Sequence, residues 1–403
     1  MSMIVPQRIL IAPSGFKESL DAGTVASAIA AGVRRILPGA DLLQLPIPDG
    51  GEGTVAAIAA SVGGTVHTTM VTGPVGQQVA AGWIMIECDQ QRTAILEMAS
   101  AAGLSLVPTD QRNPTATTTY GVGELIIAAL EAGAERIILG CGDSGTSDGG
   151  AGALMALGAT ILDENGKSIG LGGRSLRRAA HLDTTGLHPL LSGVPITLAC
   201  NIHNVLCGGK GVARVFGPQK GATSKQVAKL EAGLENWAKL LNEQAPHAAG
   251  KDLRLGPGTG ASGGLGAGLA AVLDARLGSR FEVLLDSGMA GIDLDAAMRT
   301  ADLVITAEGA IDFQTPHGKV PAEVAARAQR AGVPVLAIAG SLGQGAPSVH
   351  EIGISGLASI LTVPMPLSLA VERGEQLLID AAERTMRLVL LGSAVAARSA
   401  RVA

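Results

Sequence analysis

The stretch RIILGCGDSGTSDGGAG, residues 136–152, joins a short apolar run to six glycines and to a helical pattern that begins near Gly150. A buried strand, a glycine-rich turn and a helix in this order are typical of an α/β fold. Uncovered backbone N–H groups and the positive end of a helix favour an anion, usually a phosphate. Asp143 and Asp148 would repel that phosphate unless a divalent cation lies between them. The stretch therefore indicates phosphoryl transfer.

The α/β pattern continues at both ends of the chain. Strands are predicted at 8–12, 42–47, 302–306, 333–339 and 360–363, and helices at 21–37, 320–331 and 367–391. The middle differs, because the strand-like runs 66–71, 81–86 and 93–98 have little helix between them and favour antiparallel pairing. An amphipathic helix is expected at 224–244. The pattern predicts a Rossmann-like doubly wound domain formed by both chain ends (1–70 plus 293–403), with an inserted α+β domain (71–292).

Composition narrows the classes of protein. The 403 residues are 47% hydrophobic and 16% charged, which is typical of a globular chain. A net charge of −5 without a long basic run argues against nucleic acid as a partner. No uncharged apolar run approaches the roughly 20 residues of a membrane span, and the N-terminus does not read as a signal peptide. Four cysteines without metal or disulfide spacing favour a reducing, cytoplasmic setting.

Two glycine patterns resemble a dinucleotide fingerprint. Gly140-x-Gly142-x-x-Gly145 and Gly258-x-Gly260-x-x-Gly263 both match it, but the chain contains 56 glycines, so chance matches are expected. The first match is acidic and lies in the middle of the chain, whereas such fingerprints usually open a domain. A dehydrogenase is therefore a minor alternative. The chain also lacks a Walker A loop.

Residues 49–53, Asp-Gly-Gly-Glu-Gly, follow a predicted strand at the sheet edge where α/β proteins bind ligands. The segment is typical of a tight turn capped by Asp49. It also fits a site in which Asp49 or Glu52 is a metal ligand or a general base. A kinase that acts on an alcohol needs such a base to accept the hydroxyl proton.

A third acidic segment, from Glu308 to Asp312, follows the strand at 302–306 and leads to His317 and Lys319. Lys319 opens the next predicted helix, where a cation is unfavourable unless an anion lies close by. This inconsistency predicts a functional role for Lys319. Lys17 follows the first strand in a similar position.

Taken in order, several strings resemble the bacterial glycerate kinase family of the type without a Walker A loop, over nearly the whole chain. The most specific are PDGGEGT (48–54), SGTSDGGAG (144–152) and FGPQKGA (216–222). IAPSGFKESL (11–20), VTGPVG (71–76), GASGGLG (260–266), ITAEGAID (305–312), HGKVP (317–321) and AGSL (339–342) complete the series.

The resemblance implies transfer of the ATP γ-phosphate to D-glycerate with Mg²⁺, giving 2-phosphoglycerate, in a flavodoxin-like domain with an insertion. We expect this chain to be a monomer or a homodimer. The expected catalytic residues are Asp49, Asp148, Asp312 and Asn201, of which Asp148 and Asp312 would bind Mg²⁺ and Asp49 is the first candidate for the base. The nucleotide is expected at Lys17, Gly145, Gly149, Gly150, Lys220, Gly263, Gly264 and Lys319. Glycerate is expected at Glu52, Ser144, Glu308 and His317.

The chain departs from the family pattern at several positions. Ser14 and Asn201 stand where relatives commonly carry Asp, Ala310 stands in place of Arg, and Asp143 stands in place of Gly. Loss of an Arg removes a bidentate partner for a carboxylate or phosphate. Two alternatives therefore stay open: a kinase for another small sugar acid, and a catalytically weakened relative that binds ligand.

Overall fold

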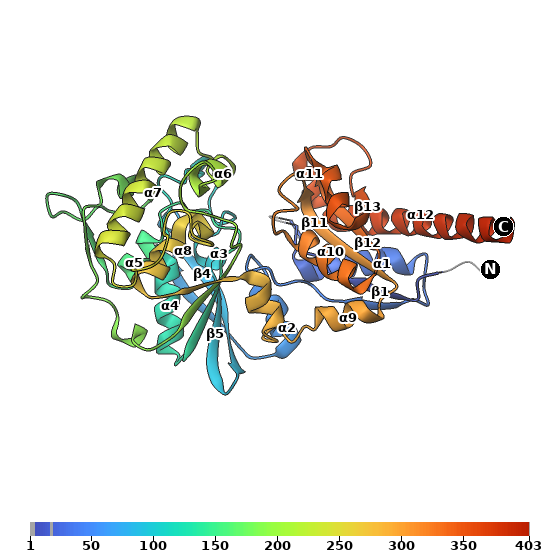
Figure 1. Cartoon of the computed structure of the whole chain (residues 1–403), viewed down its shortest axis with the longest axis horizontal. Coiled ribbons are helices and arrows are strands. Elements are labelled where there is room, and N and C mark those ends of the chain that lie inside the picture. The colour runs from blue at the N-terminus through green and yellow to red at the C-terminus, as the bar shows by residue number, and fades with distance from the viewer. Residues whose placement is uncertain (1–4, 17–18, 403) are drawn as a thin grey trace. The chain divides into compact units, whose positions relative to one another are not determined.

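The computed structural model describes residues 5–16 and 19–402, and the chain divides into two compact units. The first unit contains the chain up to Pro48 together with the chain from Gly291 onward, and the second is Asp49–Ala290. Figure 1 shows both units along the chain. The boundary predicted after residue 70 cuts a strand, β3 (Thr65–Thr72), which is paired along its whole length with the next strand. The contacts divide the chain after Pro48 instead.

The first unit is built on a parallel sheet with the strand order β13-β12-β11-β1-β2. Alternate residues of its central strands, such as Ile9 and Ile305, pack against the helices α1 and α12. The strands are β1 (Arg8–Ile11), β2 (Asp41–Gln44), β11 (Leu303–Ile311), β12 (Val335–Leu342) and β13 (Ile354–Ser359). The helices are α1 (Ala22–Arg34), α9 (Leu294–Thr300), α10 (Val320–Ala331), α11 (Leu367–Glu372) and α12 (Gly374–Val402).

Two sequence predictions for this unit need correction. The last strand is β13, at 354–359, and the apolar run 360–363 lies just beyond it. The helix predicted at 367–391 is two helices, α11 and α12, which are separated at Arg373. β13 forms because its backbone pairs with β12, although its own Gly and Ser residues are weak strand formers.

The second unit contains a mixed sheet with the order β10-β9-β6-β5-β4-β3. β3 and β4 (Gln78–Cys88) are antiparallel, and so are β4 and β5 (Gln91–Glu97), as the sequence predicted. The remaining strands β6 (Arg136–Gly140), β9 (Ile196–Cys200) and β10 (Arg276–Ser279) run parallel to β5. A small hairpin pairs β7 (Thr160–Leu162) with β8 (His181–Asp183). The helices are α2 (Thr54–Val62), α3 (Met98–Ala102), α4 (Tyr120–Glu131), α5 (Ala151–Ala156), α6 (Val212–Phe216), α7 (Ser224–Gln244) and α8 (Ala261–Val272).

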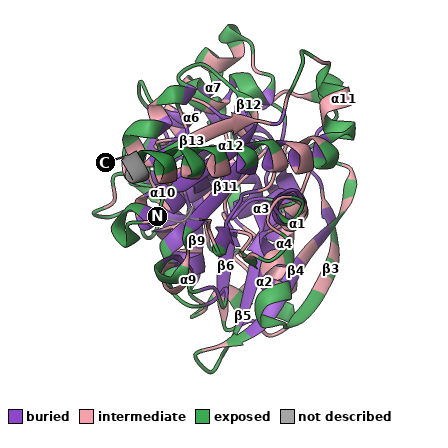
Figure 2. Cartoon of the chain, turned by 90° about the vertical axis from the view of Figure 1, so that its right-hand side faces the viewer, coloured by how far each residue is buried: buried purple, intermediate pink, exposed green. Residues whose placement is uncertain are grey.

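α7 begins and ends at the residues predicted from the sequence. Thr223 and Gln226 form a capping box at its N-terminus, and the apolar face that includes Leu230, Leu234 and Trp237 is buried. Figure 2 shows burial along the whole chain: the strands are mostly buried, and the outer faces of the helices are exposed. The site residues therefore lie at strand ends and in loops.

Candidate active site

Parallel strands of the second unit end together at one edge of its sheet. In the strand register, Glu97 of β5 lies beside Gly140 of β6, and Gly140 lies beside Ala199 of β9. Cys200 of β9 lies beside Ser279 of β10. The segments that follow these strands therefore meet at the carboxyl edge, which is where open α/β sheets bind ligands.

The loop 49–53 packs directly onto this edge. The N–H of Gly142 donates to the carbonyl of Gly50 at 2.9 Å. Gly50 has φ +82°, and a Cβ placed there would lie 3.0 Å from the carbonyl oxygen of Ala199. Only glycine combines this backbone conformation with so close an approach. The loop thus brings Asp49 and Glu52 to the ends of β6 and β9.

Asp49 is held by its own turn and by an arginine. Its Oδ1 accepts the N–H of Gly51 at 3.0 Å, which is the turn cap that the sequence allowed. Its Oδ2 lies 3.3 Å from Nη1 of Arg280, which also donates to the Asp49 carbonyl oxygen at 3.2 Å. The Arg280 guanidinium in turn lies 4.9 Å from the ring centre of Phe281. The Asp49 carboxylate is 23% exposed, so it is oriented and still reachable.

Glu52 contacts two neighbouring loops. The hydroxyl of Ser105 donates to its carboxylate, and its backbone N–H donates to Oδ2 of Asp143 at 3.1 Å. Asp143 adopts the left-handed conformation with φ +50°. Its carboxylate therefore ties loop 141–144 to loop 49–53.

The glycine-rich stretch does not expose its glycines as predicted. Residues 141–144 are half-buried, whereas residues 145–150 are buried. The N–H of Gly145 donates to Ala102, and the N–H of Gly149 donates to Gly263. Gly150 and Gly264 likewise pack closely against the facing loop. These glycines serve loop packing, and the part of the stretch that a ligand can reach is 141–144.

The surroundings of Asp148 differ from those expected of a metal ligand. Its side chain is 1% exposed, and its two oxygens accept hydrogen bonds from Thr119 and from the N–H groups of Gly150 and Gly152. Thr118 donates to it as well. Burial raises the pKa of this carboxyl. Because protein donors engage both oxygens, Asp148 fits a loop anchor and does not fit a magnesium ligand.

The close packing of these loops gives a stability prediction. Gly263 has φ +69°, and a Cβ there would lie 2.1 Å from the Thr146 carbonyl oxygen. We expect Gly263→Ala to lower the free energy of unfolding by more than about 4 kcal/mol. Gly250 has φ +76° but open space around it, so Gly250→Ala should cost only about 1–2 kcal/mol. Denaturant titration of both variants measures the difference, and equal losses would contradict the packing role.

Lys220 places a positive charge behind the reachable part of the glycine-rich stretch. Its side chain is 3% exposed, and its Nζ donates to Oγ of Ser144 at 2.9 Å and to the Thr146 carbonyl oxygen at 2.5 Å. A buried ammonium is costly unless it is well coordinated. The structure thus brings together Lys220 and Ser144, two of the residues that the sequence predicts for the site.

Asn201 follows β9 at the same edge. Its Oδ1 accepts the N–H of His203 at 3.0 Å, which makes a tight turn directly after the strand. The amide of Asn201 therefore shapes the loop at the carboxyl edge.

The first unit brings together a second group of predicted residues. Lys319 lies at the N-cap of α10, and its Nζ donates to Oδ1 of Asp312 at 3.4 Å and lies 4.0 Å from Oε1 of Glu308. The sequence predicts an anion close to Lys319, and the carboxylates of Asp312 and Glu308 lie there. His317 is exposed in the preceding turn. Lys17 lies outside the described residues.

Sequence reasoning missed two residues at the edge of the second unit's sheet. Arg280 orients Asp49, as described above, and Glu97 accepts the N–H of Val55 at 2.5 Å. Glu97 places a charge inside the predicted strand-like run 93–98, and this was the available signal. No sequence signal identified Arg280, because it lies 231 residues away from Asp49 in the sequence.

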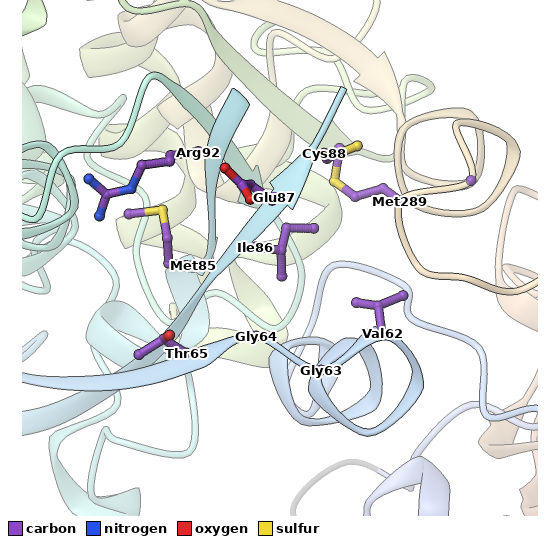
Figure 3. A pocket seen from close by; sticks show the side chains of 11 residues that line it. Val62, Gly63, Gly64, Thr65, Met85, Ile86, Glu87, Cys88, Arg92 and Met289 are labelled. Atoms are coloured by element: carbon purple, nitrogen blue, oxygen red, sulfur yellow. The ribbon is translucent and has the colours of Figure 1, made fainter. Parts of the chain in front are cut away.

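The surface pocket in Figure 3 lies elsewhere in the second unit. Its volume is about 620 Å³, and its lining includes Gly63, Met85, Cys88, Arg92 and Met289. Cys88 ends β4 and Arg92 lies at the start of β5, so the pocket is at the opposite strand ends from Glu97. None of the predicted site residues lines it.

In the part of the chain that the structure describes, no three His, Cys, Asp or Glu side chains group closely enough to hold a metal ion. None of the helices described combines the length and the apolar character that crossing a membrane requires.

Comparison with known proteins decides the family. The family model described as "Glycerate kinase family" matches residues 9–390. This chain belongs to the glycerate kinase family. The resemblance inferred from its sequence motifs is confirmed, and with it the assignment to a family of kinases.

Individual members of the glycerate kinase family match nearly the whole chain. A glycerate kinase from Bacillus subtilis is 45% identical over 94% of this chain and 96% of its own length. A glycerate 2-kinase from Escherichia coli is 45% identical over 88% of this chain and 91% of its own length. A crystal structure assigned as glycerate kinase 2 of Salmonella typhimurium LT2 is similar, with a TM-score of 0.71 and 42% identity. It covers 96% of this chain and 98% of its own, so a mixed α/β fold with parallel sheets is shared.

Proposed function

We propose that this chain transfers the γ-phosphate of ATP to D-glycerate and that the product is 2-phosphoglycerate. The observation that carries the proposal is the 45% identity to a glycerate 2-kinase over 88% of the chain. The carboxyl edge of the second unit's sheet supports it, because an oriented carboxylate and a buried ammonium lie in loops at that edge. Phosphoryl transfer depends mainly on positioning and on charge stabilisation of this kind.

In the second unit, we assign the general base to Asp49 and its orientation to Arg280. A base that accepts the glycerate hydroxyl proton must be fixed within hydrogen-bonding reach of that hydroxyl. The Asp49 carboxylate is fixed on both oxygens and is 23% exposed. Glu52 and Ser144 lie in the adjoining loops, and we assign them to contacts with the polar groups of glycerate. Lys220 supplies positive charge toward phosphate oxygens through the loop that holds Ser144.

In the first unit, we assign Lys319 to the nucleotide phosphates and Asp312 to Mg²⁺. Magnesium in kinases is usually held by one or two carboxylates together with phosphate oxygens and water. Asp312 fits this requirement, because its carboxylate is 25% exposed and its Oδ1 is steadied by Lys319 and by the N–H of Gln314. The ion would neutralise charge on the transferred phosphoryl group. Asp148 does not fit, as its buried oxygens are engaged by protein donors.

The finer description of the fold is also a proposal. The strand order β2-β1-β11-β12-β13 supports a flavodoxin-like domain, since it reads 2-1-3-4-5 when these strands are numbered within the unit. Contacts of α1 and α12 with each other, and of α10 with α9, support two separate helix layers around the sheet. The domain would be doubly wound and formed by both chain ends, with the second unit inserted.

The test is an assay of purified protein with MgATP and D-glycerate, in which ADP release is followed and the product is identified by ³¹P NMR. We expect a 2-phosphoglycerate signal that requires both glycerate and Mg²⁺. Turnover with another sugar acid but not with glycerate would replace the substrate. Nucleotide binding without any turnover would favour the weakened, ligand-binding relative. A cytoplasmic location and a monomer or homodimer stay predictions.

A further inference from the structure

Glu97 is a buried carboxylate at the edge that carries the candidate site. It is the last residue of β5, it pairs in register with Gly140, and it is 7% exposed. Buried glutamates are rare unless they are hydrogen-bonded or functional. None of the roles assigned above uses Glu97, so its burial needs an explanation.

The explanation begins at the N-terminus of α2. The first N–H groups of a helix have no partner within the helix, and a side chain at the N-cap usually accepts one of them. The N-cap of α2 is Gly53, with φ +90°, which has no side chain to do this. Glu97 takes over the task, because its Oε1 accepts the N–H of Val55 at 2.5 Å and its carboxylate also accepts the N–H of Gly53. A carboxylate at this end of a helix is further favoured by the helix dipole.

The helix start that Glu97 caps is continuous with the loop that carries Asp49 and Glu52. The hydroxyl oxygen of Thr54, the first residue of α2, accepts the N–H of Gly50 at 2.9 Å. A shift of the helix start would therefore move the whole turn. Because Arg280 and Asp143 bind the loop from other sides, Glu97 is its support from the direction of β5.

We propose that Glu97 is a positioning residue, which holds the start of α2 and thereby sets the loop with Asp49 and Glu52 in the arrangement that phosphoryl transfer requires. The inference rests on the proposed function for its catalytic consequence. The effect on the loop itself does not depend on which acid is phosphorylated.

The ionisation of Glu97 gives this role a pH dependence. Burial raises the pKa of Glu97 to about 7, its bonds to the N–H groups of Val55 and Gly53 oppose the rise, and the charges of Glu52 and Asp49 add to it. The other charged groups of this loop cluster are Arg280 and Asp143. An ionised carboxylate only accepts hydrogen bonds, whereas the neutral acid carries an O–H donor. The loop is therefore held best above pH 7, where Glu97 is ionised.

The experiment compares the wild-type chain with Glu97→Gln, which keeps the shape of the side chain and removes its charge. We expect kcat with MgATP and D-glycerate to fall about 10- to 100-fold. Amide hydrogen exchange in residues 50–56 should become about tenfold faster, through loss of a charged acceptor. The wild-type rate should rise through an ionisation near pH 7 that is missing in the variant.

The pH dependence of stability is a separate readout, and its sign is opposite to that expected for the pH dependence of activity. A raised pKa in the folded state means that the native chain binds the Glu97 proton more tightly than the unfolded chain does. The stabilisation is complete below the ordinary pKa of 4.5 and is lost as the pH rises to about 7. The wild-type unfolding midpoint should therefore fall between pH 5 and pH 8 by more than that of Glu97→Gln, although activity rises over the same range. A purely structural role would move both in the same direction.

Two further variants sharpen the comparison. Glu124→Gln is the matched control, because Glu124 accepts the N–H of Thr72 at the same 2.5 Å but lies outside the candidate site. It should leave kcat and the exchange of residues 50–56 unchanged. Glu97→Asp keeps a titrating carboxylate on a shorter side chain, so it should lose kcat and still show a pH-dependent limb.

Unchanged exchange of residues 50–56 in Glu97→Gln would overturn the positioning role, whatever the substrate. Faster exchange with unchanged kcat would overturn its catalytic consequence. If the wild type does not phosphorylate glycerate, the proposed function fails, and the exchange comparison still decides whether Glu97 holds the loop.

Discussion

Replacing Asp49 by Asn is expected to lower kcat about 100- to 10,000-fold, because the amide cannot accept the glycerate hydroxyl proton. The substitution preserves size, so the turn from Asp49 to Gly51 can still form through the amide oxygen, while the amide nitrogen takes the place of the oxygen that faces Arg280. Arg280 keeps its bond to the backbone carbonyl oxygen of residue 49. The KM for glycerate should change much less than kcat. Steady-state kinetics with ADP release as the readout measures both constants.

Asp183 offers a matched control for this substitution. Its Oδ1 accepts the N–H of Thr185 at 2.9 Å, which is the same turn geometry as in Asp49, but it lies at the end of β8 outside the candidate site. Asp183→Asn should leave kcat within about twofold of wild type. If Asp49→Asn also stays within a few-fold of wild type, Asp49 is not the base.

Replacing Lys220 by Met should lower kcat/KM for ATP about 100- to 1,000-fold, which is typical for removal of one preorganised donor from a site of charge development. Methionine matches the length of lysine but removes the charge and the bonds to Ser144 and Thr146. Because Lys220 is 3% exposed, its charge acts in a low-dielectric region where electrostatic interactions are strong. Kinetics at varied MgATP measures the loss.

Lys229 is the control for this change, since it is exposed on α7 and should tolerate Met without loss of activity. Lys220→Arg retains a positive charge, so it should recover part of the lost activity if the charge matters. Equal losses in Lys220→Met and Lys220→Arg, together with a lowered unfolding midpoint in both, would show that Lys220 acts only by packing.

Local patterns predicted the elements that local physics decides. α7 matched its predicted bounds, because the capping box and the apolar spacing are both local features. The antiparallel pairing of β3, β4 and β5 was also predicted correctly. β13 was misplaced, because its pairing with β12 outweighs the weak strand propensity of its Gly and Ser residues. The predicted domain boundary after residue 70 falls within β3, which pairs with β4 over its whole length.

The candidate site divides in a similar way. Asp49, Glu52, Ser144 and Lys220 were found from motifs, and in the structure they line or support neighbouring loops of the second unit. Asp148 and the glycines from 145 to 150 were found from the same motifs, but their side chains and N–H groups are turned into the protein. A motif identifies a loop, but it does not say which face of that loop a ligand can reach.

The sequence by itself determined the family, the α/β class and the loops that carry the chemistry, because these depend on residue types and on short spacings along the chain. Only the tertiary structure decided that Asp148 is an anchor, that Arg280 orients Asp49, and that Glu97 caps a helix whose own N-cap is Gly53. Each of these joins segments that are distant in sequence. Burial, charge and hydrogen-bond partners at such points exist only once the strands have paired, so no local pattern encodes them.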